Sequence, residues 1–453
     1  MEIINFILTI IYTYFIGYCI TNSILSFFKT KIDLFSFFGL CGIIGFGASA
    51  IELFIFSLLK IPWNQNLIVI PWLLIIVYLF IKKQYKFKIN RIKIVDLLAL
   101  FFFLFIAIIL IGWTLTNPIW AWDGWAIWNF KAHVFYFRGF IPLDFLKSSG
   151  ANFDHPEYPL LLPLSQTWIY LFLAKIQTGF SQIIYVVYYF SMMLISFSFF
   201  KKITKNYMLP LVLTILLALT PNMIAQSQVN YADILVGISF LLGLIYLIKW
   251  VKFKLKIDLY FMSILLGLGA FTKQEGGLIY ILFILFILLD ILFGNRKKLS
   301  SNIKTVVFPI SLGVIPWMIW VIYCKIHGLD TSILTSNINL HFLSTNTDRF
   351  HVIFSAIYHQ ITDNFSSAGF IWPLFAFVAI LALYFRLETK RYYFLILVTV
   401  FCYIMIYYIT PSELFKWYLA ASLDRLMLQI TPAAIFISSY TLLMLWNSKN
   451  KSR

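Results

Sequence analysis

Long apolar segments separated by short polar or basic stretches make up most of this 453-residue chain. Many of these segments are about 20 residues long, the length that an α-helix needs to cross the hydrocarbon core of a bilayer. The pattern predicts an all-α polytopic membrane protein with about thirteen transmembrane helices. The predicted spans are 4–27, 35–59, 64–81, 97–117, 181–200, 207–226, 234–250, 259–272, 278–293, 303–323, 366–385, 392–410 and a final segment before Lys449.

One apolar stretch, residues 161–175, does not fit the pattern of spans. Its start lies among three closely spaced prolines, Pro156, Pro159 and Pro163, and it is shorter than a typical membrane-crossing helix. We expect a helix here that lies in the outer membrane interface. If it crossed the membrane instead, the basic stretches that follow it would fall on the wrong side.

The basic residues gather in loops on one predicted side of the membrane. The longest of these loops is 82–93, and others are 201–205, 249–256 and 386–391. Because cytoplasmic loops are enriched in Lys and Arg, we expect these loops and the C-terminus to lie inside and the N-terminus outside. Most acidic residues and histidines of the loops then fall outside.

The composition indicates a membrane protein and argues against a soluble or a nucleic-acid-binding protein. Hydrophobic residues make up 61% of the chain and charged residues only 12%, whereas soluble domains carry about 25% charged residues. The net charge of +17 does not indicate nucleic-acid binding, because the basic residues follow the loop pattern. The four cysteines are scattered and show neither metal-ligand spacing nor a disulfide framework. The N-terminus lacks the basic region of a cleavable signal peptide, so we expect 4–27 to be the first membrane helix.

Residues 117–163 hold the densest run of potentially chemical side chains. The run comprises Asp123, Lys131, His133, Arg138, Asp154, His155 and Glu157, with Trp120, Trp122, Trp125 and Trp128 among them. Ionisable groups at membrane depth cost free energy and usually face a cavity or a partner. We expect this segment to act on a substrate at the outer leaflet, together with the pairs Lys273/Glu275 and Asp424/Arg425.

Three short motifs resemble those of the GT-C class of membrane glycosyltransferases, and in particular the protein O-mannosyltransferases and lipid A aminoarabinose transferases. WDGW at 122–125 places an acid early in the first long external loop. HPEYPL at 155–160 leads into the expected interfacial helix, and GLGAFTKQEG at 267–276 is a small-residue helix that ends in Thr-Lys. Asp233 resembles the acid that often opens the following helix in that class.

The resemblance covers residues 97–293, the expected GT-C-like core of a single transmembrane domain, with 117–163 as its catalytic loop. Residues 1–96 add extra helices before this core. Residues 294–453 resemble the class only loosely and include a second external loop at 324–365.

The resemblance implies an inverting glycosyltransferase that moves a sugar from a polyprenyl-phosphate donor to an acceptor at the outer face of the plasma membrane. The acceptor would be a glycan, a lipid or a protein. Asp123 would take the acceptor's proton as general base. Lys131, Lys273 and Arg425 would bind the donor phosphate. The remaining substrate contacts would be Trp125, His155, Glu157, Tyr158, Asp233 and Glu275. Gly124 replaces the second acid of many relatives, so we expect no metal here.

Each of these residues also has a structural interpretation. Asp123 could cap the helix that begins at 124, and the tryptophans could form an aromatic belt at the headgroup level. Lys131 and Arg138 could bind lipid headgroups. His155 could orient the Pro-rich turn, and Lys273 and Glu275 could form an exposed ion pair of little energetic value.

Two other functions remain open from the sequence. A polymerase or ligase of cell-surface polysaccharide also uses polyprenyl-linked glycans, although such proteins usually depend on external arginines and histidines. A transporter or flippase would place ionisable residues at mid-membrane in broken, paired helices. The ionisable residues of this chain fall at the predicted outer ends of helices instead.

The predicted topology can be tested by cysteine labelling in intact cells. A cysteine placed within 148–152 should react with a membrane-impermeant reagent, because the loop pattern puts this segment outside. A cysteine near the C-terminus, which we expect inside, is the control and should react only after permeabilisation. Labelling of 148–152 only after permeabilisation would contradict the predicted topology.

Overall fold

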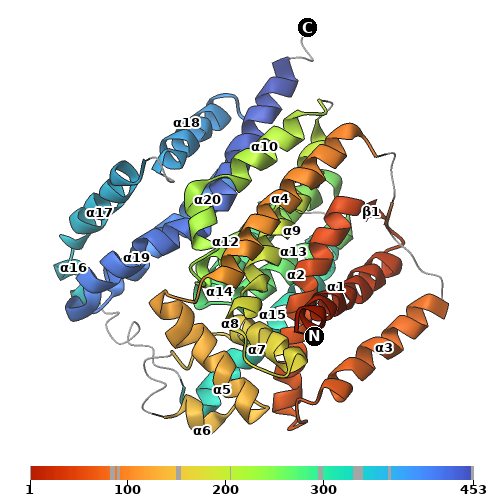
Figure 1. Cartoon of the computed structure of the whole chain (residues 1–453). Coiled ribbons are helices and arrows are strands. Elements are labelled where there is room, and N and C mark those ends of the chain that lie inside the picture. Colours follow the sequence, from red (N-terminus) through yellow and green to blue (C-terminus); the bar gives the residue numbers. More distant parts are fainter. Residues whose placement is uncertain are drawn as a thin grey trace.

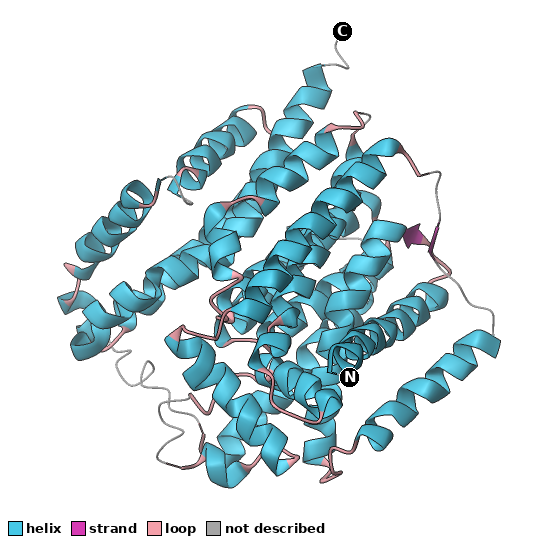
Figure 2. Cartoon of the chain, viewed as in Figure 1, coloured by secondary structure: helices cyan, strands magenta, loops and turns pink. Residues whose placement is uncertain are grey.

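The protein is an all-α membrane protein whose helices pack into one bundle, as its computed structural model shows (Figures 1 and 2). The structure describes residues 2–81, 87–88, 92–148, 155–204, 206–293, 299–329, 340–365 and 369–449. The one strand pairing in this part of the chain is two residues long and joins β1 (Ile32–Asp33) to β2 (Phe87–Lys88). Asp154, Lys205, Asp330 and most of the basic loop at 82–93 lie outside the described residues.

Nine helices in the described part of the chain are long and apolar enough to cross a membrane. The longest is a 38-residue helix near the C-terminus. They are α1 (Glu2–Phe27), α2 (Leu34–Leu58), α4 (Ile94–Thr116), α8 (Thr178–Ser181) continuing into α9 (Ile183–Ile203), α12 (Asp233–Phe253), α14 (Gln274–Phe293), α15 (Leu299–His327), α19 (Lys390–Ile409) and α20 (Ser412–Lys449).

Four of the thirteen predicted spans are shorter helices, so the prediction overstated the number of long spans. These helices are α3 (Gln65–Ile81), α10 (Leu209–Ala218), α13 (Lys256–Ala270) and α18 (Ile371–Tyr384). The 15 residues of α13 are only about 22 Å long at 1.5 Å per residue. The predicted span at 207–226 divides because Pro221, which cannot continue a helix, begins a new one, α11 (Pro221–Gln226).

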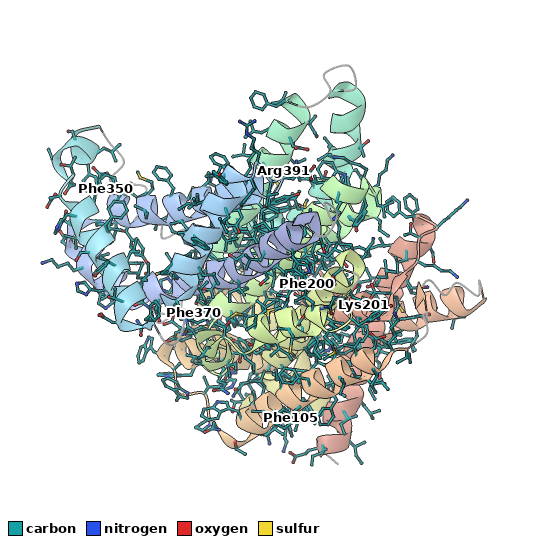
Figure 3. All side chains as sticks on the ribbon, turned by 90° about the horizontal axis from the view of Figure 1, so that it is seen from above. Phe105, Phe200, Lys201, Phe350, Phe370 and Arg391 are labelled. Carbon is teal, nitrogen blue, oxygen red and sulfur yellow. The ribbon has the colours of Figure 1, made fainter. Side chains whose placement is uncertain are left out.

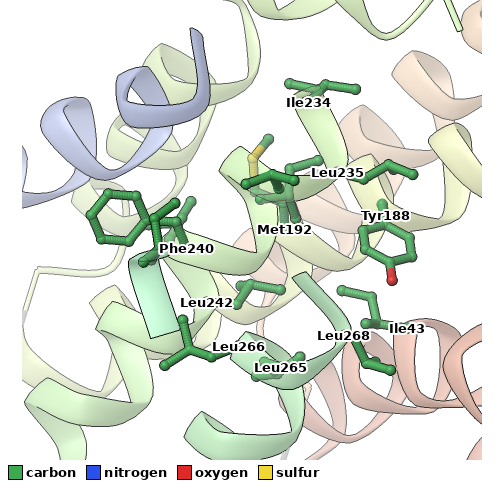
Figure 4. Close-up of a cluster of buried hydrophobic side chains, with 14 of the residues drawn as sticks. Ile43, Tyr188, Met192, Ile234, Leu235, Phe240, Leu242, Leu265, Leu266 and Leu268 are labelled. Carbon is green, nitrogen blue, oxygen red and sulfur yellow. The ribbon is translucent and has the colours of Figure 1, made fainter. Parts of the chain in front are cut away.

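The core of the bundle lies around α12 and α9. All of the apolar stretch of α12 is buried, as is 94% of that of α9, and α12 packs against α13, α20 and α9. Side chains from these helices and α2, including Ile43, Met192 and Leu266, fill the space between them (Figure 4). A helix that is apolar all round is expected to be buried on all sides.

Residues 161–175, for which an interfacial helix is predicted, fold as α7 (Leu161–Leu173), which other helices enclose. All but one of its residues are buried, because it packs against α1, α2 and α5 (Phe130–Arg138). The backbone N–H of Leu161 also donates to the carbonyl of Phe271, at the end of α13, over 2.8 Å. The helix therefore joins residues 117–148 to the core.

The two ends of the bundle differ in their charged residues. Lysines at the ends of α9 and α12 lie near the C-terminus, at the top of Figure 1, and we call this the basic end. At the opposite end lie α5 and α6 (Leu143–Leu146). There η1 (Gly124–Asn129) and the starts of α12 and α14 bring together a group of charged side chains, and we call this the network end.

Two further helices, α16 (Leu340–Thr345) and α17 (Arg349–Asp363), run along the flank of α19 and α20 (Figure 1). The buried Arg349 fixes α17 in place. Its guanidinium donates to the carbonyls of Tyr408 and Thr410 and to the hydroxyl of Ser412, which lie at the corner between α19 and α20.

Candidate active site

Four charged side chains from distant parts of the sequence meet at the network end. Arg425 of α20 donates to Asp123 Oδ2 over 2.5 Å, although the two residues are 302 positions apart. Its Nε lies 3.8 Å from Asp233 Oδ2, and Lys273 Nζ lies 2.8 Å from Asp233 Oδ1. We call Asp123, Asp233, Lys273 and Arg425 the charge network. Its two acids and two cations alternate, so each charge faces an opposite one.

Asp233 is the centre of the charge network. It is the first residue of α12, and its side chain is only 2% exposed. Besides the two cations, Gln429 Nε2 donates to its Oδ1 over 2.6 Å, and the Tyr403 hydroxyl in turn donates to Gln429 Oε1 over 2.5 Å. A carboxylate at a helix N-terminus is also favoured by the helix dipole. These partners together compensate for removing the charge of Asp233 from water.

Lys273 is buried and does not form the exposed ion pair considered from the sequence. Its side chain is 4% exposed and contacts Glu275 at 3.1 Å as well as Asp233. Burial alone would lower the pKa of Lys273, but the charges of Asp233 and Glu275 outweigh it and raise the pKa above its usual value. Lys273 is therefore a cation at neutral pH.

The small residues of the 267–276 motif allow the tight turn that carries Lys273. A Cβ at Gly276 would lie 2.1 Å from the carbonyl oxygen of Gly269, closer than atoms can approach. The two helices on either side of the turn, α13 and α14, can therefore meet closely only with glycine here. This close approach holds Lys273 against the start of α12.

Asp123 does not cap the helix that follows it. Its backbone is already helical and its side chain makes no capping hydrogen bond; its Oδ2 accepts from Arg425 instead. It precedes the π-helical η1, a kind of element that occurs frequently at functional sites. A Cβ at Gly124 would lie 3.1 Å from the carbonyl oxygen of Val229, so the glycine lets Asp123 approach the turn before α12.

A second group of side chains forms around the HPEYPL segment. Lys131 is fully buried and donates to the backbone carbonyl of His155 over 2.6 Å, so it does not lie at the surface where lipid headgroups are. His155 has a left-handed backbone with φ +48°. Its ring stacks on Tyr158 at 4.4 Å, and its Nδ1 lies 3.3 Å from Glu157 Oε1.

Burial and nearby charges act differently on the pKa values of Glu157 and Tyr158 in this segment. Burial would raise the pKa of Glu157, but the hydrogen bond from His155 and the charge of Lys131 lower it below its usual value. Glu157 is therefore a carboxylate, and its Oε2 is buried without a hydrogen-bond partner in the described structure. For Tyr158, burial and then the charges of Glu275 and Glu157 raise the pKa well above its usual value, so it stays a neutral phenol.

The four tryptophans of residues 117–163 differ in how far their side chains are exposed. Trp120, Trp122 and Trp125 are exposed, as expected for an aromatic belt, whereas Trp128 is only 1% exposed. Trp128 stacks on Tyr158 at 5.6 Å. It therefore belongs to the support of the HPEYPL segment and not to the belt.

A cavity of about 730 Å³ opens beside the charge network. Arg425, Asp424 and Tyr231 line it on one side, and residues of α17 such as His359 line it on the other. The Arg425 guanidinium lies 4.9 Å from the centre of the Tyr231 ring. This volume falls within the usual range of ligand pockets, about 300–1,000 Å³, so a ligand in the cavity can reach the guanidinium.

The structure brings together most of the residues predicted from the sequence. Asp123, Asp233, Lys273, Glu275 and Arg425 form one connected group. The HPEYPL segment, with His155, Glu157 and Tyr158, lies next to this group. The charges of Glu275 and Arg425 are close enough to shift the pKa of the Tyr158 hydroxyl. Lys131 lies with this second group, whereas exposed Trp125 packs on Trp122.

Sequence reasoning missed Gln429, Tyr403 and Tyr231. Gln429 could have been found, because it is an amide side chain in the apolar interior of α20 and polar residues inside membrane helices usually have a partner. Tyr231 lies two positions before Asp233, which the sequence did single out. No group of three or more His, Cys, Asp or Glu residues in the described part of the chain is arranged to hold a metal ion.

Comparison with protein-family models, with curated proteins and with solved structures gave no match.

A double-mutant cycle tests whether Lys273 and Asp233 depend on each other. Asp233→Asn and Lys273→Met should each lower the thermal stability of the purified protein, since each leaves a buried charge with fewer partners. The double variant should be more stable than the sum of the single effects predicts, with a coupling of at least about 1 kcal/mol.

The exposed pair Arg138 and Asp144 provides the matched control. Its atoms are also 2.8 Å apart, but its side chains are 52% and 65% exposed. The cycle of Arg138→Met and Asp144→Asn should show a coupling of only about 0–1 kcal/mol. Additive effects at Lys273 and Asp233, equal to those of the control pair, would contradict a mutually dependent buried pair.

Proposed function

We propose that the protein is an inverting, GT-C-type glycosyltransferase that uses a polyprenyl-phosphate sugar as donor at the outer face of the plasma membrane. One observation carries the proposal. The acids Asp123 and Asp233 and the cations Lys273 and Arg425 converge from four separate elements at one end of a multi-span bundle, beside a ligand-sized cavity. Acids and cations at one place are what transfer from a phosphate leaving group requires.

Asp123 is the general base in this proposal. Its Oδ2 is held by Arg425, and at 23% exposure its carboxylate is still reachable from outside the protein. The acceptor hydroxyl gives its proton to Asp123 while its oxygen bonds to the anomeric carbon of the sugar. The bond from that carbon to the phosphate oxygen breaks on the opposite face, so the configuration inverts.

Arg425 binds the donor phosphate in this proposal, and Lys273 adds charge behind it. A guanidinium has five N–H donors in a planar fork, and Asp123 engages it through one terminal nitrogen. The Arg425 Nε faces Asp233, and the other terminal nitrogen suits a phosphate that lies in the adjoining cavity. The departing phosphate is already a stable anion, so cations serve it better than a proton donor does.

The placement of the charges favours an enzyme over a transporter. Asp233 opens α12, and Lys273 directly precedes α14. Transporters commonly place their binding residues at broken helices near the middle of the membrane. Three of the four charges of the network lie at helix starts, whereas Arg425 lies within α20. Charges at helix starts suit a substrate whose reacting group lies at the membrane surface.

Asp123→Asn tests the general base. Sugar transfer by the purified protein from a polyprenyl-phosphate sugar should fall by roughly 10²–10⁴-fold, because the amide cannot accept a proton. Donor binding should persist, since Arg425 loses a competing anion and keeps its own charge. Asp144→Asn, the same change at an exposed acid paired with Arg138, should leave transfer unchanged.

Near-normal transfer by a well-folded Asp123→Asn protein would exclude Asp123 as the base. The candidates would then be Glu157, whose Oε2 is buried without a hydrogen bond in the described structure, and Asp233. Asp154, the remaining acid of the segment, lies outside the described residues.

Arg425→Met should act on donor binding. Removing the guanidinium should weaken the affinity for polyprenyl phosphate by at least about tenfold, the value of one charge-assisted hydrogen bond. Fluorescence or calorimetric titration of the purified variant measures this affinity. If the variant binds the donor as the unchanged protein does while turnover is lost, Arg425 does not bind the phosphate.

A further inference from the structure

A second cavity, at the basic end, contains charged residues that the proposed transfer reaction does not use. Its volume is about 330 Å³, near the lower end of the range for ligand pockets. It lies between the α1–α2 connection and the ends of α9, α12 and α13. Six of the residues that line it are charged, namely Lys31, Lys201, Lys202, Lys249, Asp33 and Asp258. Figure 3 looks down on this end of the bundle and labels Lys201.

Two of the four lysines have carboxylate partners. Lys201 contacts Asp96 at 2.5 Å, and the other oxygen of Asp96 accepts the backbone N–H of Lys93 at the start of α4. Lys249, which is 9% exposed, lies 3.6 Å from Asp258. These pairs fix the two lysines at the wall of the cavity.

The other two lysines, Lys31 and Lys202, form no ion pair with any carboxylate in the described part of the chain. The nearby acid Asp33 does not pair with them. Its two oxygens accept from the backbone N–H of Ser36, over 3.1 Å, and from the hydroxyl of Ser198, over 2.6 Å. Lys202 instead places its ammonium 3.9 Å from the centre of the Phe253 ring. The cavity therefore has two cations that can bind an anion.

One acceptor at the cavity also lacks a donor. Asp258 is 3% exposed, and its Oδ2 has no hydrogen-bond partner in the described structure. A buried acceptor of this kind costs free energy unless a donor reaches it. A ligand that has an anionic group and a hydroxyl would satisfy both the two lysines and this oxygen.

We propose that this cavity binds the headgroup of an anionic phospholipid with a hydroxylated headgroup, such as phosphatidylglycerol. Lys31 and Lys202 bind the phosphate, and Asp258 accepts a headgroup hydroxyl. Basic pockets between transmembrane helices are known lipid-headgroup sites, and this cavity lies at the end of a membrane bundle, where headgroups lie. The proposal uses none of the residues of the charge network and holds whether or not the protein transfers sugars.

Native mass spectrometry of the purified protein tests the proposal, with phosphatidylglycerol and phosphatidylcholine as probes. The unchanged protein should bind phosphatidylglycerol more tightly than phosphatidylcholine. The double variant Lys31→Gln/Lys202→Gln should bind it at least about tenfold more weakly, since each lysine near a membrane surface contributes about 1 kcal/mol. The matched control is Lys256→Gln/Lys390→Gln, which changes two exposed lysines at the same end that do not line the cavity. It should bind as the unchanged protein does.

Three results would overturn the proposal. The first is equal phosphatidylglycerol binding by the double variant and the unchanged protein. The second is an equal loss in the control variant, which would show general surface attraction. The third is competition by millimolar inorganic phosphate that removes the bound lipid completely, which would assign the cavity to a free anion. A thermal melt of each variant without lipid checks that the substitutions leave the fold intact.

Discussion

Charges that are buried in a membrane protein have to be paired, and the network end is built around this constraint. Asp233 is almost fully removed from water, and an isolated carboxylate there would cost many kcal/mol. Lys273, in the turn before α14, and Arg425 and Gln429, both in α20, compensate for this cost. The relative positions of α12, α14 and α20 are therefore tied to one carboxylate. An anion that binds here has to enter a group of charges that are already paired with one another.

The HPEYPL segment beside the charge network is also held by hydrogen bonds and charges. Lys131 is buried against the HPEYPL segment. Its ammonium donates to the carbonyl of His155 and interacts electrostatically with nearby Glu157. Trp320 of α15 donates to the carbonyl of Glu157 over 2.9 Å. These contacts hold the segment beside the charge network from two sides. Lys131 thus stabilises the HPEYPL segment and does not line the cavity, whereas Arg425 does line it.

The sequence was sufficient for the class of fold and for most residues of the network end, because both depend on local pattern. Runs of apolar residues indicate membrane helices wherever they occur, and Asp123, Asp233 and Lys273 stand out as rare charges beside them. The pairing of Asp123 with Arg425 joins residues 302 positions apart, and no local pattern contains it. The burial of Trp128 and of α7 also depends on which helices surround them, and no local pattern contains that information.

In the proposed reaction, Arg425 binds the phosphate of a polyprenyl-linked donor in the cavity beside the charge network. Electron cryomicroscopy of the protein in lipid nanodiscs with added polyprenyl phosphate measures this directly. The account predicts phosphate density at hydrogen-bonding distance, about 3 Å, from the Arg425 guanidinium, between α17 and α20. Donor density that lies away from both Arg425 and Lys273, or only at the basic end, would contradict it.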